Sequence, residues 1–292
     1  MDTVISIDSV TKQFGQQKVL KSISFQVNQG DIFGFLGPNG AGKTTTIRCI
    51  MDFIRPDSGR ITLLGKDSHV QSVEIKKSIG YLPAENQLIE AWNAKQHIDF
   101  YSSIRNENSL RILKLVKKLE IALNVPVKHM SSGNRQKLSF LLALVGDPKL
   151  LILDEPTRGL DPIIQNDIYD ILTNYVSTGG TVFISSHNLD EVNRICSNVG
   201  IIREGKIVAD KSMNDIKNMK IHLITVSLNN HDRLYLTSTK NLEVVNSNSS
   251  KTILKVHGDI NPVLHELSNH KLIDLEITHA PLEDVFMDYY RD

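Results

Sequence analysis

The sequence predicts an α/β domain over residues 1–218, with a helical subdomain inserted at about 92–146, and a smaller α+β domain over residues 219–292. Three observations predict this architecture. Strand and helix patterns alternate up to about residue 210, which is typical of α/β folds. Residues 92–146 carry helical patterns only, and from about residue 221 the chain becomes polar, rich in Asn and Ser and poor in Gly.

The elements expected in the first domain follow from apolar spacing. Residues 4–14 and 19–27 alternate apolar and polar side chains, as half-buried antiparallel strands do. Residues 31–37 form a short apolar strand that leads into a Gly-rich loop, and residues 44–54 a helix. The remaining elements are a strand, a short helix and a strand within 60–82, helices near 96–104, 109–121, 134–146, 162–177, 189–196 and 212–219, strands at 149–156 and 181–187, and a hairpin at 199–210.

The second domain carries four strand-like pieces and one helix between the last two of them. Pro262 suits the first turn of this helix, which we expect over residues 262–270. This order of elements resembles a ferredoxin-like unit. A closing helix is expected over residues 282–290, and the four strand-like pieces are residues 222–228, 242–245, 252–257 and 272–278.

Charge and cysteine content exclude several classes of protein. The 33 basic residues balance the 33 acidic ones, so nothing in the composition indicates a nucleic-acid partner. The two cysteines, Cys49 and Cys196, lie far apart, which argues against a disulfide framework or a zinc site. No signal peptide and no apolar run of about 20 residues is present, so we expect a cytoplasmic chain that meets a membrane only through a partner.

A phosphate-binding loop is the strongest motif in the chain. GPNGAGKTT, at residues 37–45, fits the pattern GxxxxGK[ST] and lies between an apolar strand and a helix, as the motif requires. Lys43 is expected to reach the β- and γ-phosphates of a nucleoside triphosphate, and the Thr44 hydroxyl to bind Mg²⁺. The loop residues expected to contact nucleotide are Gly37, Asn39, Gly40, Ala41, Gly42, Lys43, Thr44 and Thr45.

A second motif, LLILDEP at residues 150–156, supplies two carboxylates. The apolar strand delivers Asp154 to its carboxyl end, which is the ligand-binding edge of such a sheet. Asp154 is expected to hold Mg²⁺ through water, and Glu155 to orient and polarise the attacking water.

A third motif, MSSGNRQKL at residues 130–138, begins a predicted helix. Ser131 and Gly133 offer a hydroxyl and a bare backbone at a helix N-terminus, where anions bind. A simple helix cap explains Ser131 equally well.

Together, GPNGAGKTT, MSSGNRQKL, LLILDEPTRGLDP and SSH resemble the motifs of an ATP-binding-cassette (ABC) ATPase, in the same order and over about residues 3–218. The resemblance implies that the nucleotide is ATP and that Asp161 belongs to the D-loop. It further implies that His187 is the switch histidine, which joins Glu155 and Lys43 in catalysis. Phe14 matches the aromatic side chain that stacks on adenine, and the alternative is that it is a core aromatic residue.

In this family two cassettes pack so that each ATP lies between one phosphate loop and the opposite signature helix, which contributes Ser131 and Gly133. One motif set per chain implies a second cassette chain, in a homodimer or a heterodimer. The sequence departs from the family at Ser132, Asn134 and Arg158. The clearest departure follows GYLP, where Ala84 and Glu85 stand in place of a glutamine that contacts Mg²⁺, so Glu85 is a candidate substitute.

The tail THAPLEDVFMDYY, at residues 278–290, resembles the closing segment of drug, antibiotic and antimicrobial-peptide exporter ATPases. That type includes exporters of cytolytic peptides, such as staphylococcal phenol-soluble modulins. The resemblance implies a separate transmembrane permease subunit, location on the inner face of the cell membrane, and a partner surface at the helical insertion and residues 84–92. The alternatives are a soluble cassette acting in translation or DNA repair, and a cassette that binds nucleotide without hydrolysing it.

Overall fold

The chain folds into two compact units, Met1–Lys211 and Ser212–Asp292. The computed structural model describes residues 2–107, 110–219, 221–228, 241–248, 251–280 and 285–286. The division falls after Lys211, so helix α8 (Met213–Lys217), which the predicted division assigns to the first domain, belongs to the second unit.

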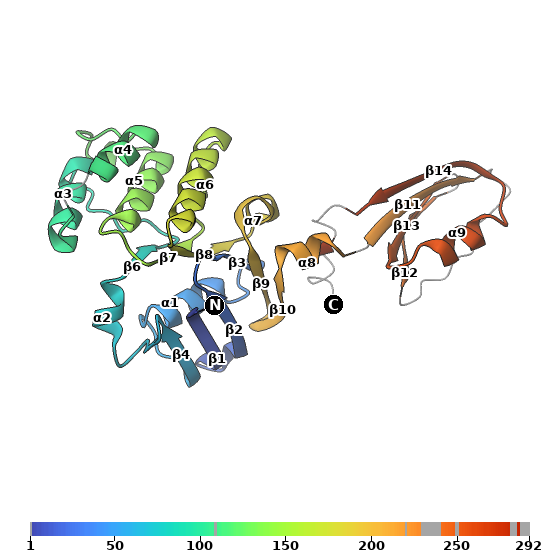
Figure 1. Ribbon diagram of the computed structural model, residues 1–292, viewed down its shortest axis with the longest axis horizontal. Coiled ribbons are helices and arrows are strands. Elements are labelled where there is room, and N and C mark those ends of the chain that lie inside the picture. Colours follow the sequence, from blue (N-terminus) through green and yellow to red (C-terminus); the bar gives the residue numbers. More distant parts are fainter. Residues whose placement is uncertain are drawn as a thin grey trace. The chain divides into compact units, whose positions relative to one another are not determined.

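Two sheets form the framework of the first unit (Figure 1). The antiparallel sheet has the order β2-β1-β4-β5, and its strands are β1 (Thr3–Phe14), β2 (Gln17–Asn28), β4 (Ser58–Leu63) and β5 (Lys66–Asp67). The other has the order β10-β9-β3-β8-β7-β6, with strands β3 (Ile32–Leu36), β6 (Ile79–Leu82), β7 (Leu150–Asp154), β8 (Thr181–Ser186), β9 (Asn198–Arg203) and β10 (Lys206–Ser212). Its four strands β6, β7, β8 and β3 pair in parallel, as does β3 with β9.

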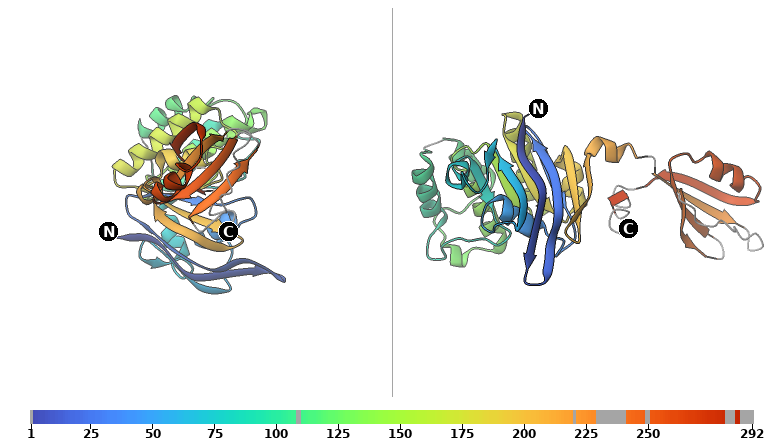
Figure 2. Two further views of the ribbon diagram at one scale, coloured as in Figure 1. Left: turned by 90° about the vertical axis from the view of Figure 1, so that its right-hand side faces the viewer. Right: turned by 90° about the horizontal axis from the view of Figure 1, so that it is seen from below.

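The core of this unit fills the space between the two sheets. The rings of Phe25, Phe33, Phe35 and Phe183 lie 5.2–6.0 Å apart between centroids. Helix α1 (Lys43–Ile50) contacts β2, β4 and β7, so it also lies between the sheets. Figure 2 shows the long β1–β2 hairpin from two sides. The predicted alternation of these strands is confirmed, because their apolar side chains face this core.

The inserted segment is helical where it is described, as predicted. Helix α5 contacts α3, α4 and strand β6, so the insertion packs onto the edge of the sheet. Figure 1 shows α3, α4, α5 and α6 grouped on one side of the second sheet. Helices of this unit beside α1 are α2 (Ser72–Lys76), α3 (Ala94–Arg105), α4 (Leu110–Lys118), the 3₁₀ turn η1 (Val127–His129), α5 (Ser132–Leu144), α6 (Pro162–Ser177) and α7 (Leu189–Ile195).

The second unit contains an antiparallel sheet with the order β12-β13-β11-β14. This is the strand order of a ferredoxin-like sheet, as predicted. Ile224 and Val226 of β11 are buried with Val263 and Leu267 of α9. The elements are β11 (Ile221–Leu228), β12 (Leu242–Ser247), β13 (Lys251–His257), α9 (Asn261–Leu267) and β14 (Leu272–His279).

The predicted closing helix at 282–290 lies outside the described residues, apart from Val285 and Phe286, which are buried. Among the helices that the structure describes, none has the length and apolar character needed to cross a membrane.

Candidate functional site

The loop of residues 37–45 joins β3 to the first turn of α1, as the sequence predicts. Close approach and backbone shape both require its glycines. A Cβ on Gly37 would lie 2.4 Å from the Ile202 carbonyl oxygen, and Gly40 and Gly42 have φ angles of 80° and 114°. The loop therefore curls tightly in front of the helix N-terminus, where backbone N–H groups favour an anion.

Lys43 extends back over this loop. Its Nζ donates to the carbonyl oxygens of Gly37 at 2.5 Å and Pro38 at 3.3 Å. Burial lowers the pKa of the Lys43 ammonium, while the negative charges of Glu155 and Asp154 oppose that shift. The ammonium is thus held by carbonyl groups that a phosphate oxygen can replace.

A cavity of about 480 Å³ opens in front of the loop. The phosphate loop lines one side of it, and the ends of β7 and β8 line the other. Its lining residues are Val19, Pro38, Asn39, Gly40, Gly42, Lys43, Thr44, Thr45, Ala84, Asp154, Glu155, Arg158 and His187. Cationic side chains and two carboxylates line the same cavity. This combination suits a polyphosphate bound together with a metal ion.

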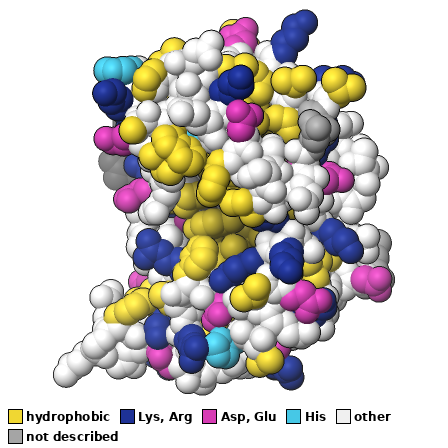
Figure 3. Space-filling model, turned by 90° about the vertical axis from the view of Figure 1, so that its left-hand side faces the viewer, with side chains coloured by type: hydrophobic (Ala, Val, Ile, Leu, Met, Phe, Trp, Pro, Cys, Tyr) yellow, Lys and Arg dark blue, Asp and Glu magenta, His cyan; other side chains and the backbone are white. Residues whose placement is uncertain are grey.

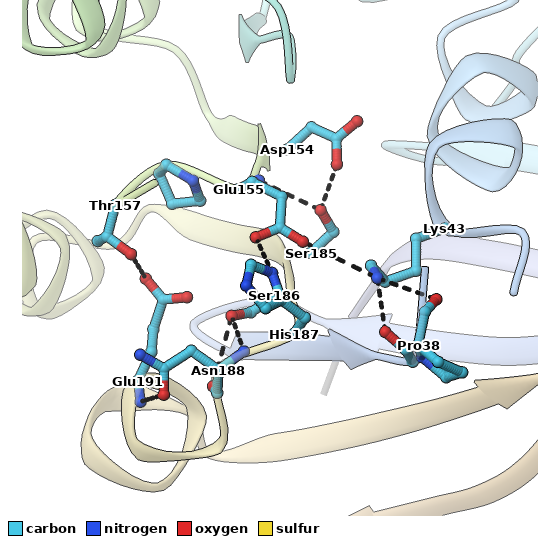
Figure 4. Close-up of polar contacts among 12 residues, drawn as sticks. Pro38, Lys43, Asp154, Glu155, Thr157, Ser185, Ser186, His187, Asn188 and Glu191 are labelled. Carbon is cyan, nitrogen blue, oxygen red and sulfur yellow. Dashed lines mark hydrogen bonds and ion pairs between the residues drawn. The ribbon is translucent and has the colours of Figure 1, made fainter. Parts of the chain in front are cut away.

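Glu155 lies between a lysine and a histidine at this cavity (Figure 4). His187 Nδ1 lies 2.6 Å from one carboxylate oxygen of Glu155, and Lys43 Nζ lies 3.8 Å from the other. The Glu155 backbone has a φ of 55°, in the left-handed region that is unfavourable for a glutamate. Its N–H donates to the Ser185 carbonyl oxygen at 3.1 Å, which holds the chain in this strained turn after β7.

Asp154 is a buried carboxylate with one unsatisfied oxygen. The side chain is 1% exposed, and its Oδ1 accepts a hydrogen bond from the Ser185 hydroxyl. Its Oδ2 has no hydrogen-bond partner among the described residues. Thr44 lines the same cavity, so a carboxylate oxygen and a hydroxyl, both hard ligands, face one space. These residues fit Mg²⁺, which usually takes one or two carboxylates together with substrate phosphates.

Five predicted nucleotide contacts besides Phe14 do not line this cavity, namely Gly37 and Ala41 of the phosphate loop together with Ser131, Gly133 and Asp161. The Ser131 hydroxyl caps α5 by accepting from the Asn134 N–H at 3.2 Å. The Asp161 carboxylate caps α6 by accepting from Ile163 and Ile164 N–H, each at 3.0 Å. A Cβ on Gly133 would meet only ordinary contacts, at 3.5 Å or more. Both capping side chains therefore serve their own helices within this chain.

Phe14 also lies outside the cavity lining and is 49% exposed, so the alternative reading of a core aromatic is wrong. The Lys12 ammonium lies 5.4 Å from its ring centroid. The Phe14 ring keeps an accessible face in this chain.

Glu85 lines a neighbouring cavity of about 590 Å³ that shares Thr44, Ala84 and Asp154 with the first. The two cavities therefore meet at the candidate metal ligands. The other lining residues are Arg48, Phe53, Tyr81, Pro83, Gln87 and Tyr101. Figure 3 shows the face of the first unit that carries α2 and α3, where apolar side chains gather in a hollow bordered by lysine and arginine.

Sequence patterns missed several residues that support the site. Ser185 fixes Asp154, and Gln136 of α5 donates through Nε2 to the carbonyl oxygens of Glu155 at 3.2 Å and Pro156 at 2.9 Å. The Thr157 hydroxyl donates to the buried Glu191 carboxylate of α7 at 2.8 Å. Of these residues, only Gln136 lies in a motif that the sequence revealed, because it belongs to MSSGNRQKL at residues 130–138 and to the helix that Ser131 caps.

Comparisons with known proteins agree with this geometry. Residues 20–158 match the family model described as ABC transporter. The chain is 32% identical to the Nod factor export ATP-binding protein I of Rhizobium etli, over 73% of this chain and 70% of that protein. It is 30% identical to the daunorubicin resistance ATP-binding protein DrrA3 of Streptomyces coeruleorubidus, over 74% and 70%. The solved structure of cbiO1 from Clostridium perfringens, part of the ABC transporter complex cbiONQ, is 26% identical and superposes with a TM-score of 0.64 over 74% of this chain and 91% of that one. The chain belongs to the family of ABC transporter ATP-binding subunits and is an ATPase of the cassette type.

Proposed function

We propose that this chain binds and hydrolyses ATP to power an exporter, and that the exported molecule, an antimicrobial or cytolytic peptide or a drug, passes through a separate transmembrane subunit. One observation carries the proposal. The Glu155 carboxylate lies at the phosphate cavity between the Lys43 ammonium and the His187 ring. This places a base, a phosphate-binding cation and a hydrogen-bonding ring around a single space.

In this proposal Glu155 is the general base. A carboxylate can accept a proton from water, and contact with His187 at 2.6 Å orients it. Both ring nitrogens of His187 are donors only when the imidazole is protonated, and in that form Nδ1 donates to Glu155 while Nε2 can donate to the γ-phosphate, which we assign as its second partner. Lys43 exchanges its loop carbonyls for the β- and γ-phosphates, because a charge-assisted bond to phosphate is the stronger one.

Thr44 and Asp154 are the proposed Mg²⁺ ligands, the aspartate acting through water. The unpartnered Oδ2 of Asp154 supports this assignment, since a buried carboxylate oxygen without a donor is costly. Bound Mg²⁺ would neutralise charge on the phosphates. Glu85 is proposed as a further, outer ligand, because it lines the adjoining cavity with the other two.

ABC ATPase cassettes act as dimers, and we propose that a second chain, identical or related, completes this site. Ser131 and Gly133 lie at the start of α5 and Asp161 at the start of α6, and none of them lines the cavity of its own chain. The signature helix of a partner can therefore close the open side of the nucleotide cavity. Phe14, with one exposed ring face, is proposed to stack on adenine.

The proposed site for the membrane subunit is the cavity beside the catalytic one. Phe53, Tyr81 and Tyr101 give it an apolar lining, and it reaches Asp154 and Thr44. A segment docked there would contact the metal ligands almost directly. This position, on the cytoplasmic side of the membrane, supports coupling between hydrolysis and transport, and the export and drug-resistance names of two relatives support the direction.

The first experiment replaces Glu155 by Gln, which preserves shape and removes the base. We expect ATP binding to remain, steady-state hydrolysis to fall by at least about 100-fold, and ATP-bound dimers to accumulate on size exclusion. The matched control is Glu90→Gln, because Glu90 is exposed and does not line either cavity. Hydrolysis by Glu155→Gln at the wild-type rate would remove Glu155 as the base, whereas no hydrolysis by the wild-type chain would favour a cassette that only binds nucleotide.

The second experiment asks which partner accompanies the chain. Affinity purification from detergent-solubilised membranes should recover a protein with several transmembrane spans in stoichiometric amount. Recovery of ribosomes or DNA instead, with no membrane protein, would contradict the exporter proposal and favour a soluble cassette.

A further inference from the structure

The three residues that follow β7 are held by side chains from two helices. Glu155, Pro156 and Thr157 lie outside every helix and strand, and the φ of 55° at Glu155 is strained. A backbone in this condition keeps its shape only when its surroundings fix it. The contacts of this segment therefore decide where the Glu155 carboxylate points.

The first contact comes from α5. The Gln136 side chain is buried, and its Nε2 donates to two successive carbonyl oxygens, of Glu155 at 3.2 Å and of Pro156 at 2.9 Å. Two bonds from one amide fix the orientation of that peptide unit. The signature helix is in this way attached to the backbone of the catalytic glutamate.

The second contact comes from α7 (Figure 4). The Thr157 hydroxyl donates to Oε1 of Glu191 at 2.8 Å, and these residues are 6% and 1% exposed. A buried carboxylate needs its donors, since an unpaired buried acceptor is strongly unfavourable. Glu191 is four residues after His187, and Asn188, the first residue after the histidine, is the N-cap of α7. The bond thus connects the segment after Glu155 to the helix after His187.

We infer that Thr157 and Glu191 are positioning residues of the ATPase: their buried hydrogen bond holds the segment carrying Glu155 and the segment carrying His187 in the relative placement that catalysis requires. The inference rests on the proposed role of Glu155. The two catalytic side chains touch at 2.6 Å, but they come from different strand ends. A shift of about 1 Å between such groups reduces catalysis by about 100-fold, without altering the phosphate loop that binds ATP.

The test separates placement from mere stability. Thr157→Val keeps the side-chain shape and removes the hydroxyl, whereas Thr157→Ser restores it. We expect Thr157→Val to lower kcat at least about tenfold, to leave KM and the ATP dissociation constant within about twofold, and Thr157→Ser to recover most of the rate. The matched control is Thr173→Val, which removes a threonine hydroxyl bonded within α6 to the Tyr169 carbonyl oxygen.

A double variant keeps the test decisive if Thr157→Val folds poorly. Thr157→Val with Glu191→Met removes both polar partners, so no buried acceptor loses its Thr157 donor and stability is largely restored. The double variant still lacks the hydrogen bond between the segment carrying Glu155 and the segment carrying His187, so its kcat should stay low while its KM is unchanged. Glu191→Gln retains an acceptor for Thr157 and should keep the wild-type kcat.

Three outcomes would overturn the inference. These are a kcat within twofold of wild type in the double variant, an equal loss in Thr157→Ser and Thr157→Val, or a loss in Thr173→Val as large as in Thr157→Val. If Glu155→Gln abolishes hydrolysis while the double variant is fully active, only the positioning inference fails. If Glu155→Gln is fully active, the proposed role of Glu155 as the base fails as well.

Discussion

The buried carboxyl group of Glu191 should make the free energy of unfolding depend on pH. The carboxyl group is 1% exposed, and burial raises its pKa from 4.5 to about 6. Hydrogen bonds from Ser186 and Thr157 and the charge of His187 act in the opposite direction, while the Glu155 charge adds to the rise. Replacing Glu191 by Gln removes the titrating group and keeps an acceptor for Thr157.

The size and sign follow from proton linkage. The folded state binds this proton more tightly than the unfolded chain, so the stabilisation is fully present below pH 4.5 and is lost as the pH rises through about 6. The rise of this pKa from 4.5 to about 6 corresponds to about 2 kcal/mol, of which about 1 kcal/mol is lost between pH 5.0 and pH 7.5. Glu191→Gln has no carboxyl group to titrate and so does not lose this stabilisation. The free energy of unfolding of the variant, relative to that of the wild type, should therefore rise by the same amount from pH 5.0 to pH 7.5.

Urea unfolding at pH 5.0, 6.0 and 7.5 measures this difference. Trp92 is the only tryptophan and packs against His97 and Phe100 in the first unit, so its fluorescence reports on the unit that contains Glu191. The midpoint of Glu191→Gln minus that of wild type should rise by roughly 0.5 M from pH 5.0 to pH 7.5. The exposed control Glu90→Gln should show no such trend, and a flat difference for Glu191→Gln would refute the raised pKa and the burial that causes it.

Three further predictions concern the same unit. Gly80→Ala should lower the free energy of unfolding by about 3 kcal/mol in urea titrations, because the added Cβ would lie 1.9 Å from the Ala143 carbonyl oxygen, and an unchanged midpoint would contradict this packing of β6 against α5. Tyr175→Phe should cost about 1 kcal/mol in the same assay, since the buried hydroxyl donates to the Pro148 carbonyl oxygen at 2.6 Å. Arg158→Ala should raise KM for ATP about tenfold in steady-state assays, with a smaller change in kcat. The reason is that the Arg158 side chain lines the cavity and forms no ion pair with the described residues, so it is available to bind phosphate. An unchanged KM would exclude contact between Arg158 and the phosphates.

Local spacing was enough to predict most of the fold. The strands predicted within 31–37 and 149–156 each contain a short apolar run, and the strands found there, β3 and β7, are buried in the parallel sheet. The helix that follows the phosphate loop ends at Ile50, earlier than the predicted residue 54, because Met51 and Asp52 form a turn in which Asp52 has a φ of 51°. Spacing alone does not reveal such a turn, since no glycine marks it.

The candidate site was predictable where chemistry and chain order coincide. Asp154 and Glu155 lie at the carboxyl end of β7, and Lys43 begins α1 after the loop that follows β3, so their convergence could be inferred from parallel-sheet geometry. The contact of Glu191 with Thr157 could not be inferred in this way. Asn188 and Glu191 have the spacing of a capping box at the start of α7, so the sequence favours a local partner for Glu191. Asn188 does cap that helix, but the Glu191 carboxylate turns to Thr157, 34 residues away in the chain, and only the tertiary packing decides between these partners.

The capping roles of Ser131 and Asp161 bear on the proposal that a second chain completes the nucleotide site. Each side chain satisfies N–H groups at the start of its own helix, so each has a capping role within this chain. A hydroxyl that accepts one bond keeps its proton to donate, and Ser131 can therefore cap α5 and still bind a phosphate oxygen. Asp161 is acceptor-only, so it cannot bind phosphate directly, and its proposed part in nucleotide binding must go through groups that donate to it. The two predicted contacts therefore differ in kind: the serine is suited to meet the nucleotide of a partner chain, and the aspartate is suited to fix the start of α6.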